Sequence, residues 1–100
     1  MANTFKVLFR GAASTGSTTL YTVPAATTTL VTSILIANTA ASTATYTLNF
    51  AGTSFATTVS VPANDTVLIE PKQVLVATNT ITGLASATTV NFHISGLEIT

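Results

Sequence analysis

The sequence predicts an all-β protein that folds as a single-domain β-sandwich of eight or nine strands. Apolar residues recur with a period of two along several stretches, which is the spacing of a strand with one buried face. Threonine is the most frequent residue, and its branched Cβ favours extended backbone. Turn residues recur about every ten residues, as in sandwiches and barrels, and no long stretch has apolar residues at helical spacing.

The period-two signal places each strand between residues typical of turns. In chain order, strands are expected near 4–10, 18–23, 29–37, 44–50, 55–61, 66–70, 73–78, 80–84 and 88–99. The clearest alternation is that of Tyr46, Leu48 and Phe50 with threonine and asparagine. Residues 29–37 become apolar on both faces in their second half, which indicates a central strand or one buried between subunits.

The connections between the expected strands contain glycine, proline and asparagine. Residues 11–17 form a loop of small residues, and Gly52-Thr53 predicts a tight hairpin. A strong turn is expected at 62–65, where proline presets φ and the Asp side chain binds nearby backbone. The phrases at 23–27 and 61–66 resemble each other, which makes them candidates for equivalent corners of two layers. The pattern does not decide between a jelly-roll and an Ig-like strand order.

The charge content is very low. Charged residues make up 6% of the chain and the formal net charge is zero, whereas ordinary soluble domains contain roughly 25% charged residues. A protein with so little charge tends to self-associate, so we expect partner subunits to cover much of its surface. The same composition argues against nucleic-acid binding, which needs a basic stripe. No apolar run approaches the roughly 18 residues of a membrane span, and Lys6 and Arg10 interrupt any N-terminal secretion signal.

The sequence offers little to build an active site, and we expect no enzyme activity, no cofactor and no metal. There is no cysteine, and the one histidine, His93, lies between two apolar residues, so alternation places it on the opposite face. Asp65 is expected to cap its own turn, and Glu70 is near enough to pair with Lys72. A calcium site formed by Asn64, Asp65 and Glu70 is the alternative, although their spacing matches no known loop.

The N-terminal segment has the most suggestive pattern. Residues 1–16 are expected to form a strand or arm and a loop, and residues 17–100 the sandwich domain. As an arm, the segment would add a strand to a neighbour or lie on an acidic subunit surface. The alternative is a first strand that stays in its own domain. The candidate subunit contacts are Phe5, Lys6, Phe9 and Arg10.

Several phrases of the chain are similar to those of a known class of proteins. They are Leu-Tyr-Thr-Val-Pro-Ala at 20–25, Ile-Leu-Ile-Ala-Asn-Thr at 34–39, Val-Pro-Ala-Asn-Asp at 61–65 and Val-Asn-Phe-His-Ile-Ser-Gly-Leu-Glu-Ile at 90–99. From about residue 17 onward the chain resembles small structural proteins of tailed bacteriophages, including phages of cyanobacteria and marine bacteria.

The resemblance implies a capsid decoration or cement protein, often a homotrimer or other homo-oligomer. Such a protein would bridge the major capsid protein or other virion subunits, in a virion assembled in the host cytoplasm. It brings no catalytic motif. Two alternatives remain, a neck, tail or fibre component of the virion and a carbohydrate-binding or hydrolytic domain. The last has weak support, because only Tyr21 and Tyr46 offer the usual sugar-stacking surface.

Overall fold

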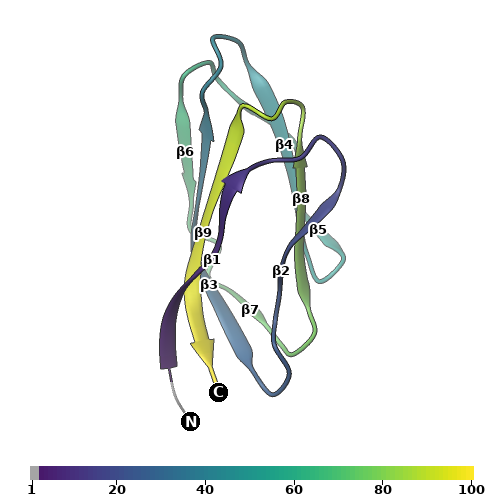
Figure 1. The fold of residues 1–100 in the computed structure, drawn as a ribbon, viewed down its shortest axis with the longest axis vertical. Coiled ribbons are helices and arrows are strands. Elements are labelled where there is room, and N and C mark those ends of the chain that lie inside the picture. The colour runs from purple at the N-terminus through teal and green to yellow at the C-terminus, as the bar shows by residue number, and fades with distance from the viewer. Residues whose placement is uncertain (1–2) are drawn as a thin grey trace.

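The protein is a sandwich of two antiparallel sheets with five and four strands, as the computed structural model shows for residues 3–100 (Figure 1). The strands are β1 (Asn3–Ala12), β2 (Thr18–Thr22), β3 (Thr28–Asn38), β4 (Ala44–Phe50), β5 (Thr53–Val61), β6 (Thr66–Ile69), β7 (Gln73–Leu75), β8 (Thr80–Ala85) and β9 (Val90–Ile99). The predicted all-β sandwich is therefore confirmed, at the upper of the two expected strand numbers. The sandwich is elongated, measuring 45 × 21 × 18 Å.

The strand order is that of a jelly roll. One sheet has the order β1-β9-β3-β6, with β7 also paired to β3, and the other has the order β2-β8-β4-β5. β6 and β7 pair with successive parts of β3, so together they act as one interrupted edge strand. The chain then alternates between the sheets in two Greek keys, which is the jelly-roll arrangement. The topology thus decides a question that the sequence pattern left open.

The core lies between the two sheets and follows the alternation seen in the sequence. Tyr46, Leu48 and Phe50 on β4 all point inward and are buried. They meet β9 of the other sheet, where Phe92 and Ile94 are completely buried. The rings of Tyr46 and Phe92 make an edge-to-face contact at a centroid distance of 6.3 Å across the layers.

The two similar phrases of the sequence form equivalent corners. Residues 23–27 connect β2 to β3, and residues 61–66 connect β5 to β6, so both lead from the four-stranded to the five-stranded sheet. In each corner the valine is buried, and the third residue after it has a positive φ, 57° at Ala26 and 54° at Asn64. Buried valine, proline and a left-handed residue therefore build the same change of layer twice.

The hairpin between β4 and β5 is as tight as predicted, but its two turn residues lie one position earlier in the chain than expected. Phe50 pairs with Thr53, and the turn residues Ala51 and Gly52 have φ angles of 52° and 77°. Two consecutive positive φ angles define a type I′ turn, whose twist matches that of the flanking strands.

Four predicted strand boundaries were wrong by two residues or more. β1 ends at Ala12 and β5 begins at Thr53, each two residues beyond the expected strand. β7 ends at Leu75, because the backbone N–H of Val76 donates to Oδ1 of Asn79 at 3.0 Å and the chain turns there. The last strand begins at Val90, two residues after the expected start.

Candidate subunit interface

The outer face of the five-stranded sheet exposes a continuous apolar row. The registers place Phe5 opposite Leu97, Leu97 opposite Leu30, and Leu30 opposite Val74, so four strands contribute to one line. We call these four residues the apolar row. Its two ends are the most exposed, since Phe5 is 87% and Val74 63% exposed. A free monomer would therefore present this row to water.

A second row on the same face contains the only histidine. Arg10 lies opposite His93, His93 opposite Leu35, and Leu35 opposite Leu68. Both leucines are exposed, Leu68 to 57%. His93 is half-buried on the outer side, as alternation predicted.

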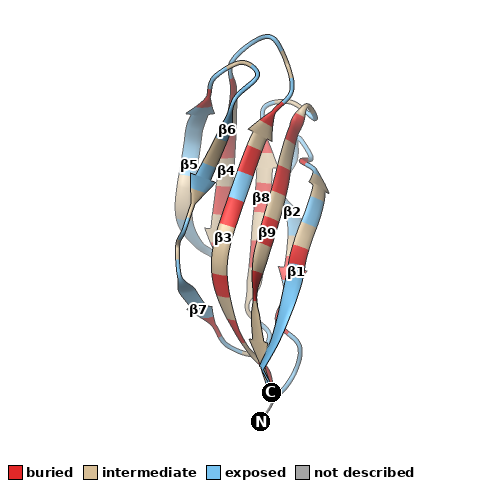
Figure 2. Cartoon of the chain, turned by 90° about the vertical axis from the view of Figure 1, so that its left-hand side faces the viewer, coloured by how far each residue is buried: buried red, intermediate tan, exposed pale blue. Residues whose placement is uncertain are grey.

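Figure 2 looks onto this face, with β3 and β9 between the exposed strands β1 and β7. Seven large apolar side chains are exposed among residues 3–100. Five of these seven lie on this face, namely Phe5, Val7, Leu35, Leu68 and Val74. Large apolar patches of this kind on monomers mark interaction sites. We call this surface the apolar face.

A β-bulge in β1 changes which of the predicted contact residues share a face. The register of β1 against β9 shifts between Val7 and Phe9. Phe9 consequently packs against the core, whereas Phe5 and Arg10 both point outward. Phe5 and Phe9 therefore lie on opposite sides of β1, because the bulge adds one residue between them.

The whole described part of the first strand lies in the sheet of its own chain. Asn3–Ala12 pairs along β9 from Ile99 to Asn91. Residues 1 and 2 of the predicted N-terminal segment lie outside the described residues. β1 is an edge strand, so its outer side chains remain available for contact with another subunit.

The outer face of the four-stranded sheet has a different chemistry. Its four strands, β2, β4, β5 and β8, contain no Asp, Glu, Lys or Arg. One row across this face consists of Thr19, Thr82, Asn49 and Ser54, and the amide of Asn49 donates to Oγ1 of Thr82 at 3.4 Å. Ser, Thr and Asn groups therefore make up this row, and we call this surface the hydroxyl face.

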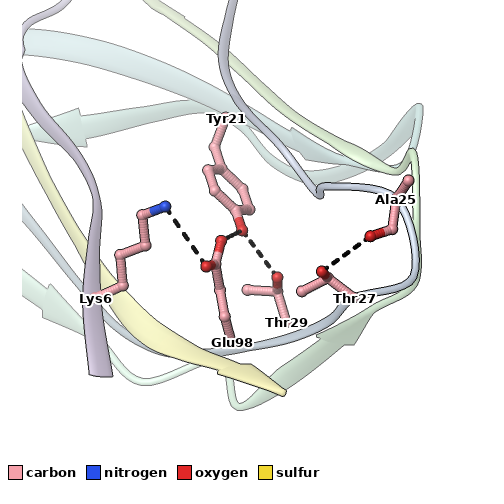
Figure 3. A network of polar contacts seen from close by, with 6 residues as sticks. All are labelled: Lys6, Tyr21, Ala25, Thr27, Thr29 and Glu98. Carbon is pink, nitrogen blue, oxygen red and sulfur yellow. Dashed lines mark hydrogen bonds and ion pairs between the residues drawn. The ribbon is translucent and has the colours of Figure 1, made fainter. Parts of the chain in front are cut away.

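A polar network ties the two sheets together near the ends of β1 and β9 (Figure 3). The hydroxyl of Tyr21, on β2, donates to Oε2 of Glu98, on β9. It also lies 2.9 Å from Oγ1 of Thr29 on β3. Because the phenol has one proton and gives it to Glu98, Thr29 is the donor in the second bond. The carboxylate of Glu98 also accepts from Nζ of Lys6 at 3.5 Å.

The surroundings of Tyr21 raise the pKa of its phenol. Burial raises the pKa of Tyr21 to about 12, and the hydrogen bond to Glu98 acts in the same direction. Tyr46 is buried in the core, and this burial also raises its pKa. Both phenols are therefore neutral over the whole physiological range, which suits a structural role.

Replacement of Tyr21 by phenylalanine should lower the free energy of unfolding by about 1–2 kcal/mol at neutral pH, because a hydrogen bond to a charged group is lost. The folded-state pKa of about 12 lies above the ordinary value of 10.0. The contribution of the phenol is therefore complete below pH 10 and is lost as the pH rises towards 12. Urea unfolding at several pH values measures the difference between the two proteins.

Tyr46→Phe is the comparison for that experiment, because burial alone raises the pKa of Tyr46, so it shows how much pH dependence a buried phenol has without a bond to Glu98. We expect the gap between wild type and Tyr21→Phe to narrow between pH 10 and 12. A gap that stays constant across this range would contradict the role given to the phenol.

A groove lies where the β4–β5 hairpin meets the segment around β7. It has a volume of about 400 Å³ and is lined by Phe50, Ala51, Thr53, Ser54, Phe55, Gln73, Val74, Leu75 and Asn79. The rings of Phe50 and Phe55 stack at a centroid distance of 4.8 Å and an interplanar angle of 5°. Its size falls within the range of small-ligand pockets.

The carboxylates do not converge. Oδ1 of Asp65 accepts the backbone N–H of Thr66 at 2.8 Å, which confirms the expected role in the turn. Glu70 lies beyond the other end of β6, so the two groups are separated by the length of that strand. Within residues 3–100 the ion pair is Lys6–Glu98, and the expected Glu70–Lys72 pair does not form. No cluster of three His, Asp or Glu side chains occurs in that range.

Among residues 3–100 there is also no helix with the length and apolar character of a membrane span. A comparison with protein-family models and a comparison with curated proteins each found no match to this chain.

Proposed function

We propose that this chain is a structural protein of a bacteriophage virion, which decorates the capsid and stabilises it by bridging subunits of the major capsid protein. The observation that carries the proposal is the apolar face, where large apolar side chains from β1, β3, β6 and β7 stand in water in the monomer. A chain with 6% charged residues and zero net charge has little electrostatic repulsion to keep such faces apart.

The fold and the sequence phrases support the same proposal. Jelly rolls are frequent in viral capsid proteins, although this fold also serves other functions. The phrases at 20–25 and 90–99, which resemble those of phage structural proteins, include outer residues of the two sheets. Burial of apolar area contributes about 25 cal/mol per Å² before association costs are subtracted, so contacts repeated over a shell add up to a large stabilisation.

Particles that lack this protein should release their DNA at a lower temperature than complete particles. The reason is that a decoration protein adds subunit contacts to the shell, which resists the pressure of the packaged DNA. A thermal-shift assay with a DNA dye measures the release temperature, and adding back the purified protein is the control. Equal release temperatures in both kinds of particle would contradict the cement role.

The copy number per particle separates the shell from the other virion positions. A copy number comparable with that of the capsid subunits favours decoration of the shell. A few copies confined to one vertex favour a neck, tail or fibre component, and quantitative mass spectrometry of purified particles distinguishes the two.

A second candidate function is the binding of a small glycan in the groove beside β7. It is favoured by the lining of the groove, which includes the aromatic ring of Phe55 and the amide side chains of Gln73 and Asn79. Aromatic rings with nearby amides are suited to sugar recognition. A glycan-array screen tests this function, and a cement protein should give no binding.

A further inference from the structure

The apolar face lies between charges of opposite sign. Arg10 is exposed on β1, at one edge of the five-stranded sheet. At the other edge, Asp65 precedes β6 and Glu70 follows it, and both are exposed. Arg10, Asp65 and Glu70 form no ion pair within residues 3–100, where the ion pair is Lys6–Glu98. Their charges are therefore available to another molecule.

The positive charge lies level with the middle of the acidic edge. Arg10, His93, Leu35 and Leu68 are directly opposite one another across the sheet. Glu70 is two residues beyond Leu68 and Asp65 three residues before it, which correspond to about 7 Å and 10 Å along the strand. If a second sheet presented the same row in the reverse order, its Leu68 and the nearby Glu70 would therefore face Arg10 of the first sheet.

We propose that the apolar face binds the same face of a second copy of this chain, about a two-fold axis parallel to the strands. Two-fold pairing of identical faces is the commonest form of homo-oligomer. Such an axis exchanges the two edges of the sheet and keeps each residue at its level along the strands. Arg10 of each copy then meets the acidic edge of its partner, and two such contacts form.

The apolar row is self-complementary under the same rotation. Because Phe5 and Val74 end the row and Leu97 and Leu30 form its middle, Phe5 meets Val74 of the second copy and Leu97 meets Leu30. Sheets packed face to face lie about 10 Å apart with their strands within about 30°, which two twisted sheets of this kind achieve. The most exposed apolar groups of the monomer are thus buried together.

The other face-to-face arrangement fits less well. An axis that runs across the strands would place each edge against itself, so Asp65 and Glu70 would face the acidic edge of the second copy. It would also leave both arginines at the same edge. Lys72 does not oppose the arrangement that we propose. In the dimer it would face β1 of the second copy near Lys6, and the charge of Lys6 is neutralised by Glu98.

The pairing deepens the proposed function, on which it rests for its biological role. It covers the apolar face with a second copy, so the dimer, with the hydroxyl faces of its two four-stranded sheets on the outside, would be the unit that meets the capsid subunits. Ser, Thr and Asn groups then keep the dimer soluble despite the low charge.

Sedimentation equilibrium of the purified chain tests the proposal. We expect a mass of twice 10.2 kDa for the wild type. Arg10→Glu and Glu70→Arg should each weaken the dimer about tenfold or more, because each brings like charges near each other across the interface. The double variant Arg10→Glu/Glu70→Arg should regain most of the affinity, since it restores opposite charges across the two-fold axis.

A matched pair of variants shows which outer face forms the dimer interface. Leu97→Lys and Leu84→Lys change half-buried leucines on the outer sides of the two sheets, and circular dichroism shows that each variant is folded. We expect Leu97→Lys to be monomeric and Leu84→Lys to remain dimeric. A monomeric wild type, a trimer, or dissociation by Leu84→Lys alone would overturn the proposal.

The two proposals fail separately. A wild-type monomer in solution that is nevertheless incorporated into virions would remove the pairing and leave the virion function. A dimer with the expected variants that is absent from purified particles would remove the virion function and leave the pairing.

Discussion

Gly96→Ala should destabilise the protein by about 3 kcal/mol, a large part of the 5–15 kcal/mol that holds a typical domain together. A Cβ at this position would collide with the backbone carbonyl oxygen of Leu30 on β3. It would also lie 3.0 Å from Cδ1 of Leu8 on β1. The backbone cannot yield easily, because β9 is hydrogen-bonded to β1 on one side and to β3 on the other. Urea unfolding followed by circular dichroism measures the loss.

Two other glycines calibrate this experiment. A Cβ at Gly16 would meet nothing within 4 Å, so Gly16→Ala should stay within about 0.5 kcal/mol of the wild type. At Gly83 the nearest groups are the ends of the side chains of Leu48 and Leu20, which can move. Gly83→Ala should therefore fall between the other two variants. If Gly96→Ala were as stable as the wild type, β9 and β3 would be able to move apart enough to accommodate the added Cβ, which would contradict this prediction.

Period-two alternation predicted most of the strands because it depends on local burial. The expected strand at 44–50 is β4 with the same bounds, and its apolar residues all face the core. Alternation was less informative at an edge. Val59 lies two residues before the buried Val61, yet it is exposed on the edge strand β5, next to Thr58 with a φ of 48°. Edge strands are covered from one side only, so burial there is incomplete.

The candidate interface depends on strand registers, which the sequence pattern does not contain. Phe5, Leu30, Val74 and Leu97 are far apart in the chain and form one row because of how four strands pair. The bulge that moves Arg10 to the side of Phe5 adds one residue to β1. Periodicity within a single strand cannot show either feature, because both are set by contacts between strands.

Asn38→Ala should lower the free energy of unfolding by about 2–3 kcal/mol, because buried groups lose their partners. Asn38 ends β3 and is 2% exposed. Its Nδ2 donates to the carbonyl oxygens of Ser42 at 2.8 Å, Val61 at 3.2 Å and Pro62 at 3.3 Å. Its Oδ1 accepts the N–H of Ala40 at 3.1 Å. One side chain thus joins the β3–β4 connection to the corner after β5, and thermal unfolding measures what it contributes.

Two comparisons separate hydrogen bonding at Asn38 from simple loss of volume. Asn38→Asp keeps the shape but replaces the donor with an oxygen that faces carbonyl groups, so at neutral pH it should be more destabilising than Asn38→Ala. Asn91→Ala removes a half-buried asparagine from the outer side of β9 and should change stability by about 0.5 kcal/mol at most. If Asn38→Asp proved as stable as the wild type, donation from Nδ2 would not hold this corner. The buried valine and the proline of residues 61–66 would then be what fixes the change of layer.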